Sequence, residues 1–340
     1  MSGARRGPSP TVGVSYNTHT APTKSPAKST PSAGAHTIPL TMTIISPPAY
    51  AELLSLCRSA SSRLVVLTGA GLSTESGIPD YRSPAGSYSK GHRPMTHDEF
   101  VGSHAARVRY WSRSMRGWRP FASKQPNAGH HSLAALERAG VVTQIVTQNV
   151  DGLHTKAGSR DVLELHGTSH SVSCMACGES EPRRSLQARL VALNYWQLAS
   201  VHPMAADLVD LDAREAELRA DGDADVRLGA AAEAAFRIPP CRHCGGVLKP
   251  DVTFFGDIVP RARSRRAMEA VRQASALLVA GTSLSTLSAF RLADAAARDG
   301  TPLAVVNRGE TRLDRPPGVP HLKVEAGCGE TLSRLVDDLI

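Results

Sequence analysis

Short, continuous apolar runs alternate with stretches of helical pattern through most of this chain. The runs lie at residues 64–67, 141–146, 162–165, 277–280 and 303–306, and a helical pattern from Tyr50 to Ser61 precedes the first. Strands that are apolar throughout, rather than at alternate positions, are typical of a parallel sheet covered on both faces. The sequence therefore predicts an α/β fold with a parallel sheet and helices on both of its faces.

Small and polar residues follow directly after each predicted strand. They are Thr68 to Gly71, Thr147 to Asp151, His166 with Gly167, Gly281 to Ser283, and Asn307. In open α/β sheets, ligands bind at the carboxyl ends of the strands. We therefore expect these five groups to line one ligand-binding crevice.

The group after the first strand contains a Gly-x-Gly motif at Gly69–Gly71. Such a turn lets the backbone approach a phosphate, with the N–H groups of the next helix directed at the anion. The usual hydride-transfer fingerprint has a third glycine, which Thr74 replaces here, and Pro79 resists a helix soon afterwards. We therefore expect an irregular loop that carries Asp80 to Arg82 over the ligand. Taken alone, Gly69–Gly71 would also fit a plain glycine turn.

His166 is the candidate general base of this crevice. An imidazole whose pKa is close to neutrality can take a proton from a sugar hydroxyl. Asn149 and Asp151 bracket Val150 after the neighbouring strand, so in an extended segment their side chains share a face and can reach one polar ligand. The alternative for this pair is that each side chain satisfies its own backbone as a turn residue.

Four of the six cysteines form two Cys-x-x-Cys pairs, Cys174 with Cys177 and Cys241 with Cys244, and each pair is followed by glycine. This spacing indicates a metal site in a reducing compartment rather than a secreted disulfide framework. Four thiolates complete a tetrahedral Zn²⁺ shell, so we expect one structural zinc. His243 inside the second pair is an alternative ligand, and a zinc ribbon that only binds nucleic acid or protein is an alternative role.

The net charge of +8 does not indicate a nucleic-acid-binding protein. The first 51 residues hold four basic residues and no acidic one, which leaves +4 for the remainder, and only 4% of residues are aromatic. The basic residues are also scattered along the chain rather than clustered on one helix. No apolar run approaches the roughly 18–20 residues that span a bilayer. We therefore expect neither sequence-specific nucleic acid nor a membrane as partner.

Residues 1–46 are rich in Ser, Thr, Pro and Ala and basic, and we expect them to be disordered. They lack the apolar core of a signal peptide, which favours a cytoplasmic location. A mitochondrial transit peptide is an alternative, although the prolines would interrupt an amphipathic helix. A start at Met42 is another alternative.

Together, these motifs resemble the sirtuin family of NAD-dependent protein deacylases. The matching segments follow the family's order over residues 50–340: Gly69–Arg82, Thr147–His154, Leu165–Gly167, both cysteine pairs, Phe254–Asp257, Gly281–Ser283 and Val306–Asn307. Three further segments, Ser73–Ser76, Arg109–Trp111 and Thr155–Arg160, resemble the class II branch, which includes a mitochondrial member.

The resemblance implies a Rossmann-like NAD-binding domain at 47–169 and 249–340, interrupted by a zinc-binding module at 170–248. Acyl-lysine on a protein substrate would enter between the two and pair with residues 252–255. NAD would be a consumed co-substrate: nicotinamide leaves, the acyl group passes to ADP-ribose and the lysine is freed. A eukaryotic chain of this branch would be mitochondrial.

The resemblance also assigns roles by position. His166 would be the general base, and Asn149 would order the ribose and a water. The residues that would contact NAD are Gly69, Ala70, Gly71, Ser73, Ile78, Asp80, Tyr81, Arg82, Gln148, Asn149, Asp151, Gly281, Thr282, Ser283, Asn307 and Cys328. Of these, Asp151 and Ile78 would hold the nicotinamide carboxamide, and Asn307 the adenosine ribose. Tyr81 stands where other branches have phenylalanine.

Three other functions compete with deacylation. Mono-ADP-ribosyl transfer would use the same NAD site. A hydride-transferring dehydrogenase is disfavoured by Thr74 at the third glycine position, and a zinc-ribbon adaptor without catalysis leaves the five groups after the strands unexplained. The sequence does not indicate the preferred acyl chain, the protein substrates or the oligomeric state.

Overall fold

A computed structural model describes residues 45–60, 63–84, 86–201, 219–220 and 230–340. Of the predicted disordered segment, residues 1–44 lie outside these ranges. Its last residue, Ser46, precedes helix α1 (Pro47–Ser59), which has Pro47 in its first turn, where a missing N–H costs nothing. Within the described residues, no helix is both long and apolar enough to cross a bilayer.

A six-stranded parallel sheet forms the larger part of the fold, in the order β3-β2-β1-β7-β8-β9. Its strands are β1 (Leu64–Thr68), β2 (Val142–Thr147), β3 (Val162–Glu164), β7 (Ala276–Ala280), β8 (Leu303–Val306) and β9 (Leu322–Val324). The first five are the strands predicted from the apolar runs, and every residue of β1, β7 and β8 is buried. The predicted α/β fold with a Rossmann-like parallel sheet is therefore confirmed.

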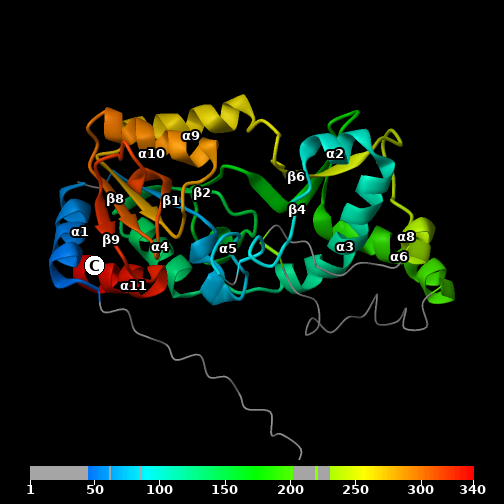
Figure 1. The fold of residues 1–340 in the computed structure, drawn as a ribbon, viewed down its shortest axis with the longest axis horizontal. Coiled ribbons are helices and arrows are strands. Elements are labelled where there is room, and N and C mark those ends of the chain that lie inside the picture. The colour runs from blue at the N-terminus through cyan, green and yellow to red at the C-terminus, as the bar shows by residue number, and fades with distance from the viewer. Residues whose placement is uncertain (1–44, 61–62, 85, 202–218, 221–229) are drawn as a thin grey trace, which may run out of the picture. The chain divides into compact units, whose positions relative to one another are not determined.

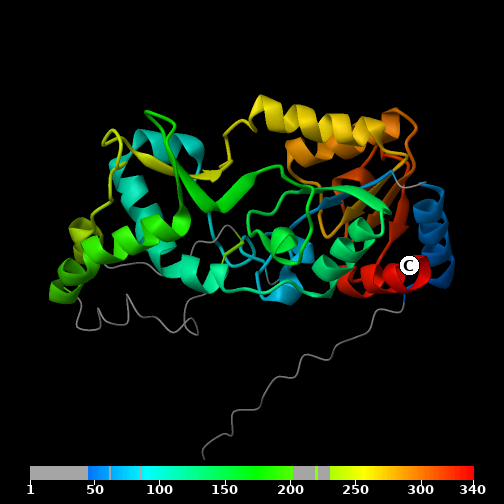
Figure 2. The same cartoon turned by 180° about the vertical axis from the view of Figure 1, so that it is seen from behind.

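Helices cover both faces of this sheet, as Figures 1 and 2 show. On one face, α1, α4 (Ala128–Arg138) and α11 (Cys328–Leu339) pack against Leu64 and Val66 of β1. On the other, α9 (Arg261–Gln273) and α10 (Leu287–Arg298) pack against Val65 and Leu67. Because successive side chains of a strand point to opposite faces, the four apolar residues of β1 serve both cores.

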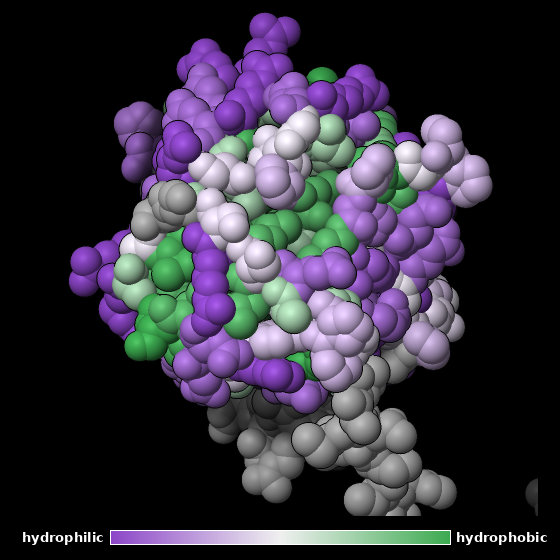
Figure 3. Space-filling model, turned by 90° about the vertical axis from the view of Figure 1, so that its left-hand side faces the viewer, coloured by the Kyte–Doolittle hydropathy of each residue, from purple (hydrophilic) through white to green (hydrophobic). Residues whose placement is uncertain are grey.

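Strand β9 is one edge of the sheet, opposite β3, and it was not predicted, because it is short and has Lys323 at its centre. Figure 3 looks onto this end of the sheet, where apolar residues show among polar ones. Half-buried apolar side chains there include Leu56 of α1 and Leu322 of β9, both packed against the core. A lysine in an edge strand opposes pairing with another chain.

A second, three-stranded antiparallel sheet carries the cysteine pairs, in the order β5-β4-β6. Its strands are β4 (Gly167–Cys174), β5 (Ser180–Pro182) and β6 (Leu248–Val252). Helices α2 (His97–Gly102), α3 (His104–Ala122), α6 (Arg183–Val201) and α8 (Ala230–Ala235) share one apolar core with it. The packing therefore groups α2 and α3 with the cysteine module, whereas the sequence placed residues 83–130 in the large domain.

Apolar residues from the crevice also enter this second core. Ile78 of the loop after β1, and Val150 and Leu153 after β2, are buried in the same cluster as Phe100 and Trp111. Short helix α5 (Leu153–Lys156) follows directly after Asp151 and Gly152. The residues expected to hold the ligand are thus fixed by both cores.

Candidate functional site

The glycine loop after β1 packs directly on the end of β7. The Gly69 N–H donates to the Ala280 carbonyl (3.2 Å), and the Gly71 N–H donates to the Gly281 carbonyl (2.8 Å). A Cβ at Gly71 would lie 2.9 Å from the Gly281 oxygen, so this approach requires glycine. Two single-turn 3₁₀ helices (Ala70–Leu72 and Thr74–Ser76) follow, and the next α-helix begins only at His97. The structure therefore has the predicted irregular loop, without the α-helix that follows a hydride-transfer fingerprint.

Replacing Gly281 by alanine is expected to destabilise the protein more than the same change at Gly300. Both have positive φ (63° and 71°), so each substitution carries a backbone cost of about 1–2 kcal/mol. The added Cβ at Gly281 would lie 2.4 Å from the Leu72 nitrogen, whereas at Gly300 it meets nothing within 4 Å. Urea unfolding of the two variants measures the difference. Equal losses would show that the contact between the two loops is not tight.

A buried hydrogen-bond network joins the loop after β1 to the end of β2. The Ser73 hydroxyl donates to Asp151 Oδ2 (2.7 Å), and Asn149 Nδ2 donates to Ser73 Oγ (3.0 Å) and to the Gly69 carbonyl (3.1 Å). Burial raises the pKa of Asp151, although the hydrogen bonds from the Leu153 N–H and from Ser73 oppose it. Asn149 and Asp151 thus lie on one side of their segment and contact the same serine, while Asp151 also caps its own turn.

Two buried histidines lie beneath this network. His154 Nε2 is 2.9 Å from the Thr68 hydroxyl, and its ring centroid is 4.9 Å from that of His130. His130 Nε2 is in turn 3.5 Å from Ser73 Oγ. Burial lowers the pKa of His130 to about 4 and that of His154 to about 3, so both rings are neutral near pH 7. Sequence analysis did not single out either ring.

Acidification to about pH 5 is expected to lower the free energy of unfolding through these two histidines. Their folded pKa values lie below the unfolded value of about 6.5, so the unfolded state binds more protons as the pH falls. Above the unfolded pKa, neither histidine lowers the free energy of unfolding. As the pH falls from the unfolded pKa toward the folded pKa values, the free energy of unfolding decreases, by about 2 kcal/mol per histidine at about pH 5. Urea unfolding of wild type and His154→Gln at neutral and acidic pH measures this. The variant should lose about 2 kcal/mol less on acidification, and identical losses would contradict the assignment.

His166 lies between the end of β3 and the first turn of α10. Its Nδ1 is 3.1 Å from the Gln148 carbonyl and its Nε2 is 2.7 Å from Ser288 Oγ. Burial lowers the pKa of His166 to about 4. The hydrogen bond that the ring donates to the Gln148 carbonyl opposes this shift, and the Arg263 charge lowers the pKa further. The ring is therefore neutral near pH 7, as a general base must be.

Gln148 connects three of the strand ends. Its Nε2 donates to Thr282 Oγ1 (2.9 Å) and to the Thr68 carbonyl (3.1 Å), and its Oε1 accepts from Thr286 Oγ1 (3.2 Å). Ser283 Oγ, one residue beyond Thr282, is 2.9 Å from Ser285 Oγ. With His166 on the Gln148 carbonyl, the groups after β1, β2, β3 and β7 form one continuous polar surface.

Residues after β8 and at the start of α11 extend this polar surface. Cys328 Sγ is 3.5 Å from the Val306 carbonyl, which also accepts from the Gly281 N–H (3.0 Å), and burial raises the pKa of Cys328 to about 12. The Asn307 amide donates to the carbonyls of Arg308 and Gly309 (2.9 and 3.1 Å), so its side chain shapes its own turn.

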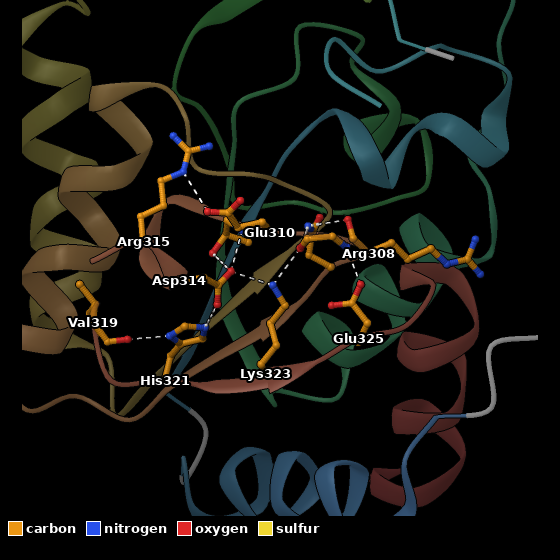
Figure 4. A network of polar contacts seen from close by, with 11 residues as sticks. Arg308, Glu310, Asp314, Arg315, Val319, His321, Lys323 and Glu325 are labelled. Carbon is orange, nitrogen blue, oxygen red and sulfur yellow. Dashed lines mark hydrogen bonds and ion pairs between the residues drawn. The ribbon is translucent and has the colours of Figure 1, made fainter. Parts of the chain in front are cut away.

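An ion network supports the turn after Asn307 (Figure 4). Lys323 Nζ donates to the Gly309 carbonyl (2.9 Å) and to Asp314 Oδ2 (3.0 Å), and the Gly309 N–H donates to Glu325 Oε1 (2.5 Å). Burial alone would raise the pKa of Asp314, but the hydrogen bonds from Thr311 and Lys323 lower it to about 2. The carboxylate stays charged near pH 7 and holds the turn to the edge strand.

The loop residues 78–88 take separate roles. Ile78 is buried in the second core, and Asp80 Oδ1 accepts from the backbone N–H groups of Arg82 and Ser83 (2.9 and 2.8 Å). The ring centroids of Tyr81 and Tyr88 are 5.4 Å apart, and the guanidinium carbon of Arg82 lies 5.3 Å from the Tyr88 centroid. In this structure, Asp80 and Arg82 form the loop itself and do not enter the polar network of Ser73, Asn149 and Asp151.

The four predicted cysteines converge on one point. Their Sγ atoms all lie within 4.8 Å of one another, with 3.5 Å between Cys174 and Cys244 and 3.8 Å between Cys177 and Cys241. A tetrahedral shell with Zn–S bonds of about 2.3 Å places its sulfurs about 3.8 Å apart. The backbone N–H groups of Ala176 and His243 also point at thiolates (3.4 Å each). The residues therefore fit one structural zinc, and the His243 ring is not part of the cluster.

The fold and site together define an α/β protein with a glycine loop and a polar network at the ends of its parallel strands, and with a four-cysteine cluster that fits one zinc. The Sir2 family model matches residues 69–288. The chain is 49% identical to NAD-dependent protein deacylase SRT2 of Arabidopsis thaliana, over 86% of this chain and 78% of that protein. It is 44% identical to NAD-dependent protein deacetylase 3 of Pseudomonas syringae pv. tomato, over 87% of this chain and 99% of that protein.

Solved structures are similar as well. A Sir2 protein with a deacetylated p53 peptide and 3′-O-acetyl ADP-ribose aligns with a TM-score of 0.64 at 28% identity, covering 85% of this chain and 98% of that one. The chain belongs to the Sir2 family.

Proposed function

We propose that this protein is an NAD-dependent protein-lysine deacylase that uses His166 as its general base. The observation that carries the proposal is the position of the His166 imidazole after β3. Its Nδ1 lies 3.1 Å from the carbonyl of Gln148, whose side chain contacts Thr68 and Thr282 at the ends of β1 and β7. The relatives' names support this reaction, and they do not favour the alternative of mono-ADP-ribosyl transfer.

NAD is the consumed co-substrate in this proposal. Gly69 to Gly71 approach the pyrophosphate, as the backbone of a glycine-rich turn after a strand can. Thr282 and Ser283 face the phosphate side, and Asn307 and Cys328 the adenosine. Arg82 contacts the phosphates and ribose, and Tyr81 covers the reactive ribose.

The nicotinamide end is held by Asp151 and Ile78, and Asn149 orders the ribose and a water. His166 Nε2 takes the proton of a ribose hydroxyl, and the resulting imidazolium keeps donating from Nδ1 to the Gln148 carbonyl. Before this, the acyl carbonyl oxygen of the substrate would displace nicotinamide from the ribose carbon and leave an imidate. The ribose oxygen would then attack the imidate carbon, and water would complete the collapse to free lysine and O-acyl-ADP-ribose.

Three finer assignments belong to the same proposal. The segments Ser73–Ser76, Arg109–Trp111 and Thr155–Arg160 support membership of the class II branch. The protein substrates carry acyl-lysine in extended segments that pair with residues 252–255. The location is cytoplasmic, or mitochondrial in a eukaryote.

A panel of acyl-lysine peptides of different chain length and charge, each incubated with NAD, tests the proposal. We expect nicotinamide release that requires the peptide, with one O-acyl-ADP-ribose formed per lysine freed. Free carboxylate with unconsumed NAD would contradict deacylation by this route. Label from NAD attached covalently to a protein target in place of O-acyl-ADP-ribose would favour ADP-ribosyl transfer.

A further inference from the structure

The N-terminal end of α10, together with its N-cap residue Thr286, makes two side-chain contacts around the general base. The Ser288 hydroxyl is 2.7 Å from His166 Nε2, and the Thr286 hydroxyl donates to Gln148 Oε1 (3.2 Å). The Gln148 carbonyl in turn lies 3.1 Å from His166 Nδ1. Gln148 and Ser288 thus contact one imidazole nitrogen each, although Ser288 and His166 are 122 positions apart in sequence.

The partners of His166 define its tautomer. A backbone carbonyl can only accept a hydrogen bond, so Nδ1 carries the proton and donates to Gln148. In the neutral ring, Nε2 then has a lone pair, and the Ser288 hydroxyl is the donor to it. Ser288 therefore occupies the nitrogen that a general base must use.

We infer that Ser288 is a positioning residue for the general base, and that its hydroxyl holds the place on Nε2 that a ribose hydroxyl takes during the reaction. This inference rests on the proposed function. The hydrogen bond from Ser288 keeps the imidazole neutral and correctly turned before NAD arrives. The ribose hydroxyl then donates to the same lone pair, and its proton passes to Nε2.

A donor to the lone pair of Nε2 stabilises the neutral ring and disfavours the imidazolium. Two other ionisable groups belong to neighbouring elements. The charge of Arg263 on α9 lowers the pKa of His166, and burial raises the pKa of Glu164 on β3. Neither donates to Nε2. Loss of the Ser288 hydroxyl should therefore raise the pKa of His166 by about half a unit to one unit.

The variants Ser288→Ala and Ser288→Thr test this in the full-length protein without NAD. Titration of the histidine ring signals by NMR, with His166→Gln to assign the His166 signal, should show a higher pKa in the alanine variant. The threonine variant keeps the hydroxyl and should titrate as wild type does. Ser285→Ala is the matched control, because its hydroxyl contacts Ser283 and leaves His166 untouched.

Kinetics provides the second measurement. The acid limb of the pH profile of kcat/KM for NAD reports the free enzyme, so its apparent pKa should rise in Ser288→Ala. The acid limb of kcat reports the complex, in which the ribose hydroxyl occupies Nε2, so its apparent pKa should not change. An unchanged pKa in Ser288→Ala, or an equal shift in the alanine and threonine variants, would overturn the inference. The NMR titration needs no turnover, so a wild-type protein without peptide-dependent nicotinamide release would refute the proposed function alone.

Discussion

Replacing His166 by glutamine is expected to reduce peptide-dependent formation of O-acyl-ADP-ribose by at least about 100-fold, because a positioned general base contributes that much or more. Glutamine keeps the size of the side chain and a hydrogen bond to the Gln148 carbonyl, but it cannot take the ribose proton. The measurement is the initial rate of O-acyl-ADP-ribose formation with NAD and an acyl-lysine peptide. Unfolding curves of both proteins, measured in parallel, verify that the variant is folded.

His131 provides the matched control, since it is an exposed histidine on α4 outside the crevice. His131→Gln should retain the wild-type rate. A His166→Gln protein that is folded and nearly as active as wild type would remove His166 from the mechanism, and another base would have to be sought on the same polar surface.

Removing one zinc ligand is expected to cause the other large effect. Cys177→Ser should lose the bound zinc and lower the midpoint of thermal unfolding by at least about 5 °C, a loss of about 2 kcal/mol or more. The reason is that the four thiolates join β4 to the segment before β6, and no other covalent or metal link among the described residues does so. Zinc content by elemental analysis and the unfolding midpoint are the two measurements.

His243→Gln separates the two ligand sets that the sequence left open. The ring of His243 is outside the four-sulfur cluster, so this variant should keep one zinc per chain and the wild-type midpoint. Zinc loss in His243→Gln together with zinc retention in Cys177→Ser would reverse the assignment.

The large sheet could be predicted because its strands are buried on both faces and therefore appear as uninterrupted apolar runs. The small sheet could not. Strand β4 reads Gly-Thr-Ser-His-Ser-Val-Ser-Cys, with few apolar residues, and β5 is three residues long. The grouping of α2 and α3 with the cysteine module was also missed, because it depends on Phe100 and Trp111 meeting Leu186 and Phe236 from distant segments.

The residues of the site likewise divide into those that the sequence could indicate and those that only the folded structure brings together. Residues at the ends of predicted strands could be placed in one crevice, since parallel strands end at one edge of the sheet. Ser288 gave no signal, because its role comes only from contact with a histidine far away in the chain. The buried histidines His130 and His154 meet only after α4 and α5 have packed together.

The burial of Ile78 in the core of the cysteine module has a thermodynamic consequence. The loop that is proposed to hold nicotinamide packs on the same apolar cluster as Cys174 and Cys241, so order in one stabilises order in the other. We therefore expect zinc and NAD to be linked ligands, although the residues assigned to them differ. By reciprocity, whatever factor zinc adds to the affinity for NAD, NAD adds to the affinity for zinc.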